Sequence, residues 1–179
     1  MPYSIEEHKH RFAAWAAGRA ATVNGCRFKV EEGKSILEEA GLKRVASDLN
    51  YFPDANQFDQ HHREWRNAVI ASAKAYDKKF THGVAAKLIN IYLKSIFVCG
   101  YTPEHPKIKA IHPPIDSVLL DELYRQNIGG KRLIWQKARK VRWSKLSSKE
   151  YEEIIETIRT VLPENKGLWE IEQFWRGFQ

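Results

Sequence analysis

Apolar residues recur along most of this chain at the three- and four-residue spacing that is typical of helices. In the first half, the spacing predicts helices over residues 4–24, 31–40, 55–76 and 80–98. The first of these opens on a serine followed three residues later by a glutamate, which is the form of a capping box. Neither alternating strand pairs nor an internal repeat is present in the sequence, so the pattern predicts an all-α protein.

Prolines and glycines interrupt the second half of the chain. Residues 100–114, GYTPEHPKIKAIHPP, predict a loop, and a new helix is expected to begin near Asp116. After the break at Gly129–Gly130 the basic stretch is expected to be helical, and Ser147 with Glu150 offers a second capping box. A last amphipathic helix is expected over LWEIEQFWRGFQ. The residues expected to face the core there are Leu168, Ile171, Trp175 and Phe178.

Length and composition indicate one compact unit. With 179 residues, of which 43% are hydrophobic, the chain is long enough to bury one substantial core, as a single domain over residues 1–179 or as two small lobes around a cleft. Cys26 and Cys99 fit no disulfide framework. The opening residues lack the apolar core of a signal peptide, and no apolar run reaches the ~20 residues of a membrane span. We expect a soluble, cytoplasmic protein with no membrane partner.

Positive charge is concentrated in one segment. The net charge is +7, yet residues 123–149 contain no Asp or Glu, so the rest of the chain is slightly negative. Trp135 and Trp143 lie among these basic residues, and a basic field with interleaved aromatic residues is typical of proteins that bind nucleic acids. A solvated helix face beside two core tryptophans gives the same pattern and stays an alternative. The basic residues are Arg125, Lys131, Arg132, Lys137, Arg139, Lys140, Arg142, Lys145 and Lys149.

The stretch FTHGVAAKLINIYLKSIFV, residues 80–98, raises the first question of chemistry. Most of this helix is apolar, which predicts a central position, and its polar residues Lys87, Asn90 and Lys94 form one narrow seam. Burial and the positive end of the helix dipole both lower the pKa of a lysine from its ordinary ~10.4. Lys87 is therefore a candidate amine nucleophile facing a cleft. A lysine that extends its ammonium to water is the commoner case and stays the alternative.

Two short motifs in sequence order carry a resemblance to known proteins: GVAAK at residues 83–87 and PPID at residues 113–116. Together they resemble the helix-hairpin-helix DNA glycosylases of the Gly/Pro-Asp type, and especially the 8-oxoguanine glycosylase branch. The resemblance implies a compact helical glycosylase fold with a helix-hairpin-helix core over about residues 55–124. The chain departs from the family pattern at Ala85, which replaces a second glycine, and at His82, which replaces a proline.

The resemblance also implies a mechanism. Lys87 is expected to attack C1′ of an extruded nucleotide and form a Schiff base, with Asp116 orienting or deprotonating it and AP lyase activity following. The expected partner is duplex DNA containing an oxidised or otherwise modified base, either in base excision repair or in defence against hypermodified phage DNA. No cofactor or metal is expected, and the protein is expected to be a monomer.

Further residues are expected to contact the DNA. The resemblance implies that the backbone amides of Gly83, Val84 and Ala85 contact a phosphate. The basic segment is expected to hold other phosphates, so that affinity falls with salt. Its candidate residues are Lys131, Arg132, Lys137, Arg139, Lys140 and Arg142. The candidates for the base pocket are His112, Trp169, Gln173 and Phe174.

Two other classes of function remain open on the sequence. A DNA-binding module of the same fold without chemistry would use Lys87 as a phosphate contact. An unrelated helical protein that binds RNA or another macromolecule would carry GVAAK and PPID by coincidence. Covalent trapping on DNA separates the glycosylase from both alternatives, and absent or salt-insensitive DNA binding would favour the unrelated protein.

Overall fold

Helices make up the regular structure of this computed structural model, which describes residues 3–100 and 104–178. Within these residues no strand forms, and one isolated bridge pairs Val23 with Cys26. The prediction of an all-α protein is confirmed. The α-helices are α1 (Ile5–Ala21), α2 (Val30–Glu39), α3 (Leu42–Ser47), α4 (Phe58–Ala73), α5 (His82–Leu93), α6 (Pro106–Lys109), α7 (Ser117–Arg125), α8 (Arg132–Lys140) and α9 (Ser148–Val161).

Short helical turns connect or extend these helices. Six of them within the described residues are 3₁₀ turns. One is a π-helical turn, in which each hydrogen bond spans five residues instead of four. They are η1 (Leu49–Tyr51), η2 (Ala55–Gln57), η3 (Lys74–Tyr76), the π-turn η4 (Lys94–Val98), η5 (Ile128–Gly130), η6 (Trp143–Lys145) and η7 (Leu168–Phe174). No helix in the described part of the chain has both the length and the apolar character needed to cross a bilayer.

Side-chain caps fix where several helices begin. The hydroxyl of Ser4 accepts a hydrogen bond from the amide of Glu7 at 3.2 Å, so α1 begins where the sequence predicts. Asp116 caps α7 with its carboxylate in the same way. A full capping box opens α9, where Ser147 and Glu150 each bond to the other's backbone amide.

The apolar stretch at residues 80–98 forms two helical pieces instead of one. α5 ends at Leu93, and the amide of Cys99 donates to the carbonyl of Lys94, five residues back, at 3.0 Å. The Ser95 hydroxyl donates to the carbonyl of Ile91 at 2.8 Å, and so uses an acceptor of the regular α-helical ladder. The register therefore loosens into a π-turn just after the part of the helix that carries Lys87.

The predicted loop at residues 100–114 contains a short helix, α6, over its described part. The ring of His105 accepts a hydrogen bond from the amide of Lys107 at 3.2 Å, and Pro106 occupies the first helical position, where its missing N–H costs nothing. Isolated helices of this length are unstable, so α6 depends on the core contact of Ile108, which is fully buried.

The last segment is a 3₁₀ helix where an amphipathic α-helix was predicted. A 3₁₀ helix repeats every three residues, so Leu168 and Ile171 share the buried face of η7. The helix ends at Phe174, Trp175 is extended, and Phe178 lies in a turn with its side chain 75% exposed. The prediction that Phe178 faces the core is wrong, because it assumed that the helix continues to the end of the chain.

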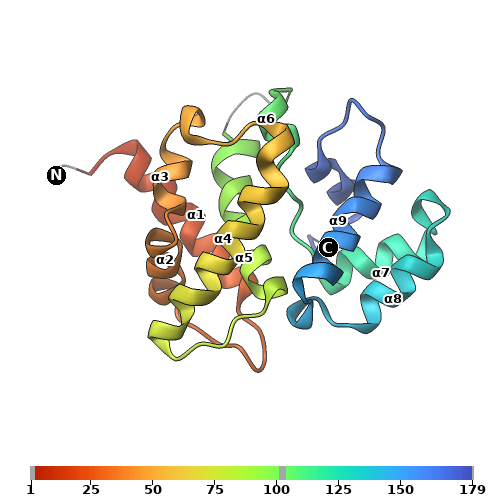
Figure 1. Ribbon diagram of the computed structural model, residues 1–179, viewed down its shortest axis with the longest axis horizontal. Helices are drawn as coiled ribbons and strands as arrows, with labels where there is room; N and C mark the ends of the chain where they lie inside the picture. The colour runs from red at the N-terminus through yellow and green to blue at the C-terminus, as the bar shows by residue number, and fades with distance from the viewer. Residues whose placement is uncertain (1–2, 101–103, 179) are drawn as a thin grey trace.

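The core has two parts that meet at α5. In Figure 1, α1 to α5 form one side of the molecule and α7 to α9 the other, with the segment after α6 passing between them. α5 contributes Val84 and Leu88 to the first hydrophobic cluster and Ala86 to the second. Trp143 packs against both clusters. This position between the two sides explains why α5 is apolar over most of its surface.

Candidate functional site

Lys87 lies one turn into α5, at the junction of the two clusters. Thr81 opens the helix, its hydroxyl accepting a hydrogen bond from the amide of Val84 at 3.2 Å. Because the neighbours of Lys87 along the helix are buried, its stem runs through the interior, and only 11% of the side chain is exposed. The alternative of a lysine that extends freely into water does not describe this side chain.

Asp116 meets Lys87 as the sequence predicts. The Lys87 Nζ lies 3.4 Å from Asp116 Oδ2. The other carboxylate oxygen, Oδ1, accepts a hydrogen bond from the amide of Leu119 at 2.9 Å and thereby caps α7. The indole N–H of Trp175 donates to Oδ2 at 3.2 Å. The carboxylate is held from two directions, so its distance to the amine is set by the backbone of α7 and by Trp175.

The surroundings of Lys87 lower its pKa, so its amine is neutral more often than it would be in water. Burial lowers the pKa of Lys87 from its usual value, and the negative charge of Asp116 opposes that change. The indole ring of Trp143 lies over the amine, with its centroid 4.3 Å from Nζ, and stabilises the charged form by a cation–π contact. Burial outweighs the effect of Asp116, so the pKa of Lys87 lies below its usual value.

A second amine and carboxylate pair lies beside the first. Lys94, two turns after Lys87 on the same seam, contacts Glu172 of η7 at 2.5 Å. Burial raises the pKa of Glu172, with Lys94 opposing the rise and the charge of Asp116 adding to it. The site therefore contains two lysines and two carboxylates in a mostly buried setting.

Sequence reasoning missed Glu172 and Trp143 as members of this site, and assigned Trp175 to the core. Nothing in their local sequence marks them, since they come from η7, η6 and the extended end of the chain and meet Lys87 only through packing. The one available signal was an aromatic residue inside the basic segment, and it pointed to DNA in general.

Asn90, predicted to share the exposed seam with Lys87, is instead completely buried. Its amide nitrogen donates to the carbonyl of Pro113 at 2.8 Å and contacts the hydroxyl of Tyr151 at 2.9 Å. Its oxygen is hydrogen-bonded to His62 at 2.7 Å. Asn90 therefore joins α4, α5 and α9 to the segment that leads to Asp116, and the expectation that it faces a cleft is wrong.

His112, a candidate for the base pocket, belongs to the same interior network. Its ring is hydrogen-bonded to the hydroxyl of Tyr151 at 3.0 Å and to Asp59 at 2.9 Å. Burial lowers the pKa of His112, and the hydrogen bond to Asp59 opposes this. With both ring nitrogens occupied and 3% of the residue exposed, His112 has no free group for a base edge in this arrangement.

The other candidates for the base pocket lie around η7 without reaching the amine. Gln173 is exposed, and its amide nitrogen donates to the carbonyl of Glu170. Phe174 is half-buried and packs on the second cluster, as a core residue does. Trp169 is half-buried, and its indole nitrogen has no hydrogen-bond partner among the described residues. Over the same residues, no hydrogen bond joins the three to Lys87 or Asp116.

The backbone amides at the start of α5 are already engaged inside the protein. The Gly83 amide donates to the carbonyl of Leu146 at 3.2 Å. The amide of Val84 donates to the hydroxyl of Thr81, and that of Ala85 to the carbonyl of Thr81. All three residues are buried. In this arrangement none of these amides is available for the phosphate contact that the resemblance implies.

Two adjoining grooves run along the basic segment next to the amine. One, of about 340 Å³, is lined in part by Arg139, Arg142 and Trp143. The other, of about 310 Å³, includes Lys140 and shares Ser117 and Arg139 with the first. Ser117 follows Asp116, and the ring of Trp143 lies 4.3 Å from Lys87 Nζ, so the first groove lies beside the site.

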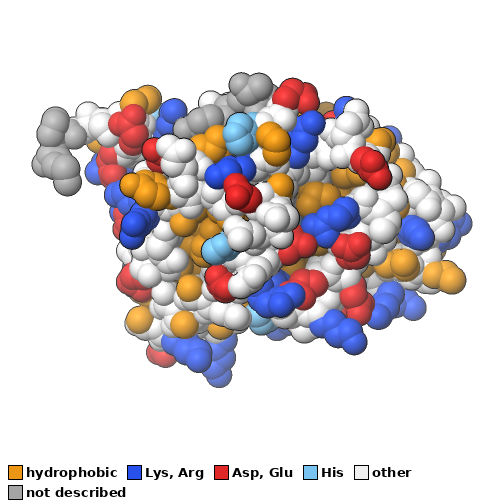
Figure 2. Space-filling view, turned by 45° about the horizontal axis from the view of Figure 1, so that its top comes forward, with side chains coloured by type: hydrophobic (Ala, Val, Ile, Leu, Met, Phe, Trp, Pro, Cys, Tyr) orange, Lys and Arg blue, Asp and Glu red, His pale blue; other side chains and the backbone are white. Residues whose placement is uncertain are grey.

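The predicted phosphate contacts differ in whether an acidic side chain already pairs with them. Lys140 and Arg142 line the grooves, and neither has an ion-pair partner among the described residues. Arg139 is paired with Asp121 at 2.6 Å, and Lys137 with Glu153 at 3.3 Å. Acidic and basic side chains also lie close together on the face drawn in Figure 2.

The predicted contacts Lys131 and Arg132 stand outside both grooves. Neither lines them, and the guanidinium of Arg132 lies over the ring of Tyr124 at 5.6 Å. The basic residues without an ion-pair partner among the described residues are therefore divided: Lys140, Arg142 and Lys145 line the grooves beside the amine, whereas Lys131, Arg132 and Lys149 do not.

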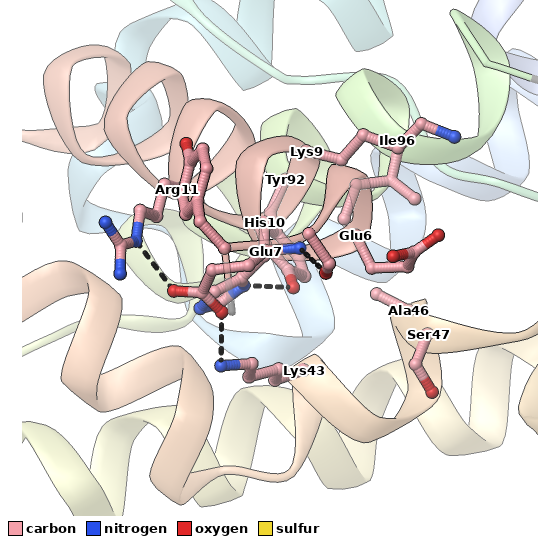
Figure 3. A pocket seen from close by; sticks show the side chains of 12 residues that line it. Glu6, Glu7, Lys9, His10, Arg11, Lys43, Ala46, Ser47, Tyr92 and Ile96 are labelled. Carbon is pink, nitrogen blue, oxygen red and sulfur yellow. Dashed lines mark hydrogen bonds and ion pairs between the residues drawn. The ribbon is translucent and has the colours of Figure 1, made fainter. Parts of the chain in front are cut away.

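A cavity of about 880 Å³ lies away from Lys87, between the start of α1, α3 and the far side of α5. Figure 3 shows Glu7 between Arg11 and Lys43, to which it is bonded at 2.7 and 2.9 Å. His10, on the same wall, is hydrogen-bonded to Tyr92 at 2.8 Å. These polar groups satisfy one another, so no described side chain on this wall offers an unpaired buried polar atom to a ligand.

Neither a metal site among the described residues nor a family among known proteins is identified for this chain. No cluster of three or more His, Cys, Asp or Glu in the described part of the chain is placed to hold a metal ion. No family model matches the chain, and neither a curated protein nor a solved structure is detectably similar to it.

Proposed function

We propose that this protein is a DNA glycosylase that removes a modified base through a lysine Schiff base and then acts as an AP lyase. One observation carries the proposal: the mostly buried amine of Lys87, whose pKa is lowered by burial, lies 3.4 Å from the carboxylate of Asp116. A structural lysine has no need of a lowered pKa, which costs stability, whereas an amine nucleophile depends on it.

The reaction uses both residues. Neutral Lys87 attacks C1′ of an extruded nucleotide, the C1′–N bond breaks, and the base leaves with the bonding electrons and takes up a proton. Asp116 accepts the proton lost by the attacking amine and stabilises the positive charge that develops on the sugar. The C1′–O4′ bond then breaks, O4′ takes up the proton held by Asp116, and the nitrogen lone pair forms an iminium ion with C1′. Loss of a C2′ proton then expels the 3′ phosphate by β-elimination.

The basic grooves supply the contact with DNA. Arg142 and Lys145, in the groove beside Trp143, have no acidic partner among the described residues and so remain free for phosphates. The groove shares Trp143 with the amine, so a strand held there has its sugars close to Lys87. To Lys94 and Glu172, which pair with each other beside Lys87 and Asp116, we assign contacts with polar atoms of the extruded base.

Borohydride trapping on DNA tests the proposal. We expect incubation with duplexes containing an abasic site or one of a panel of modified bases to give a covalent adduct that is lost in Lys87→Gln. Asp116→Asn is expected to slow adduct formation by about 10²-fold or more, within the range for a general base. Lys34→Gln, which removes a lysine on α2 paired with Glu38, serves as the control. Absence of an adduct on every duplex would remove the Schiff-base mechanism.

A DNA-binding module without chemistry is the second candidate. The cation–π contact between Lys87 and Trp143 favours it, because that contact stabilises the ammonium form. In this case Lys87→Gln weakens binding while no duplex is cleaved or trapped by the wild type. DNA binding that is absent or insensitive to salt would indicate an unrelated helical protein instead.

A further inference from the structure

The turn at Trp143 stands between the basic groove and the amine. One side of the indole lies over Lys87 Nζ, with the ring centroid at 4.3 Å, and the residue also lines the groove together with Arg142 and Lys145. Trp143 is half-buried and packs against both hydrophobic clusters. Trp143 is therefore shared between the groove and the Lys87 site.

Two hydrogen bonds and one close backbone approach hold the turn against the start of α5. The amide of Gly83 donates to the carbonyl of Leu146 at 3.2 Å, and the hydroxyl of Thr81 donates to the carbonyl of Ser144 at 2.9 Å. A Cβ atom on Gly83 would lie 1.8 Å from the carbonyl oxygen of Trp143, so only glycine permits this approach. The backbone of Trp143 is thus fixed to the helix that carries Lys87, which sets the ring on the amine.

The residue before Trp143 adopts a conformation that favours glycine. Arg142 has a φ of +29° and a ψ of 121°, in a region that residues with a side chain rarely occupy. The chain leaves α8 and enters the turn through this residue, so the strain is part of what directs Trp143 toward the amine. Strain of this kind persists only where surrounding contacts enforce it, as the contacts to α5 do here.

We propose that Trp143 is a specificity-determining residue of the Lys87 site, whose indole covers the amine in the free protein and forms the face on which the extruded nucleoside stacks. This rests on the proposed function. Aromatic side chains are the usual stacking surface for bases that leave a helix. When Lys87 loses its proton, the cation–π attraction that holds the ring against the amine is lost, so the indole is displaced more easily by a nucleoside as the amine becomes nucleophilic.

Chemical labelling without DNA tests whether Trp143 covers the amine. Reductive methylation with formaldehyde and cyanoborohydride, followed by peptide mass spectrometry, measures the rate at Lys87. We expect Trp143→Ala to raise this rate several-fold while exposed Lys9 reacts unchanged, and Trp143→Phe to restore much of the protection. Trp15→Ala removes an exposed tryptophan of α1 and should change nothing. A Lys87 rate unaffected by Trp143→Ala overturns the covering role.

Binding to two duplexes tests the stacking role. One duplex carries a mispaired 2-aminopurine and the other a tetrahydrofuran abasic analogue, which has no base to stack. We expect Trp143→Ala to raise the Kd of the 2-aminopurine duplex about tenfold or more and to leave the Kd of the abasic duplex nearly unchanged. An equal rise for both duplexes, or none, overturns stacking.

These outcomes are distinguishable from failure of the proposed function. If the wild type binds neither duplex and forms no adduct on any DNA, the glycosylase proposal fails and the stacking role fails with it. The labelling rate of Lys87 then still decides whether Trp143 covers the amine, since that measurement involves no nucleic acid.

Discussion

At the scale of single residues, the protonation of Lys87 links stability to pH. Burial holds the pKa of Lys87 below that of an unfolded lysine, so between the two values the folded protein binds fewer protons than the unfolded chain. We expect the free energy of unfolding of the wild type, relative to Lys87→Gln, to rise as the pH increases through the folded pKa toward about 10.5. Urea denaturation of both proteins at pH 7 to 10 measures this. A constant difference between them would show that the amine titrates as it does in water.

Arg142 allows backbone strain and charge to be separated. Arg142→Gly and Arg142→Ala both remove the charge, but only glycine relaxes the φ of +29°. The alanine variant keeps strain of about 1–3 kcal/mol, whereas the glycine variant avoids it but loses about 1 kcal/mol more chain entropy on folding. We therefore expect the free energy of unfolding of Arg142→Gly to be about 1 kcal/mol higher than that of Arg142→Ala. Denaturant unfolding of the pair checks this. If both variants lose the same amount of DNA affinity, the loss comes from the missing charge and not from the backbone conformation.

At the scale of elements, docking of the Trp143 turn on α5 depends on Gly83. Gly83→Ala places a Cβ in contact with the carbonyl of Trp143, and we expect it to lower the free energy of unfolding by about 1–3 kcal/mol and to increase labelling of Lys87 as the turn moves away. Gly18→Ala in α1 is the matched control, because its new Cβ meets Val30 at an ordinary 3.4 Å. A stable Gly83→Ala with unchanged labelling would contradict the docking.

The sequence was informative where local chemistry decides the structure. Ser4, Asp116 and Ser147 start helices because their side chains cap the first turn, and the apolar surface of α5 indicated its central place. The 3₁₀ form of η7 escaped prediction, because it depends on contacts with the second cluster more than on local preference. Glu172 escaped for a related reason, since it reaches Lys94 only through tertiary packing.

At the scale of the whole molecule, a buried network joins its two sides. Tyr151 of α9 contacts Asn90 and His112, and burial raises its pKa, so the hydroxyl stays protonated at neutral pH. Tyr151→Phe leaves their polar atoms unpaired in the interior, and we expect it to lower the free energy of unfolding by about 1–3 kcal/mol. Thermal and urea unfolding measure this, with exposed Tyr51→Phe as the control. An unchanged stability would mean that water replaces the hydroxyl.

The distribution of free charge over the molecule predicts how DNA binding responds to salt. Each phosphate contact contributes about −0.9 to the slope of log K against log salt, because counterions are released from duplex DNA. Lys140 and Lys145 line the two grooves without acidic partners among the described residues, so replacing both by alanine should make the slope shallower by about 2. Lys9 and Lys43 line the distant cavity, and replacing both should leave it unchanged. Fluorescence anisotropy from 50 to 300 mM salt gives the slopes. If both double variants made the slope shallower by the same amount, DNA would contact the protein without preference for the face beside Lys87.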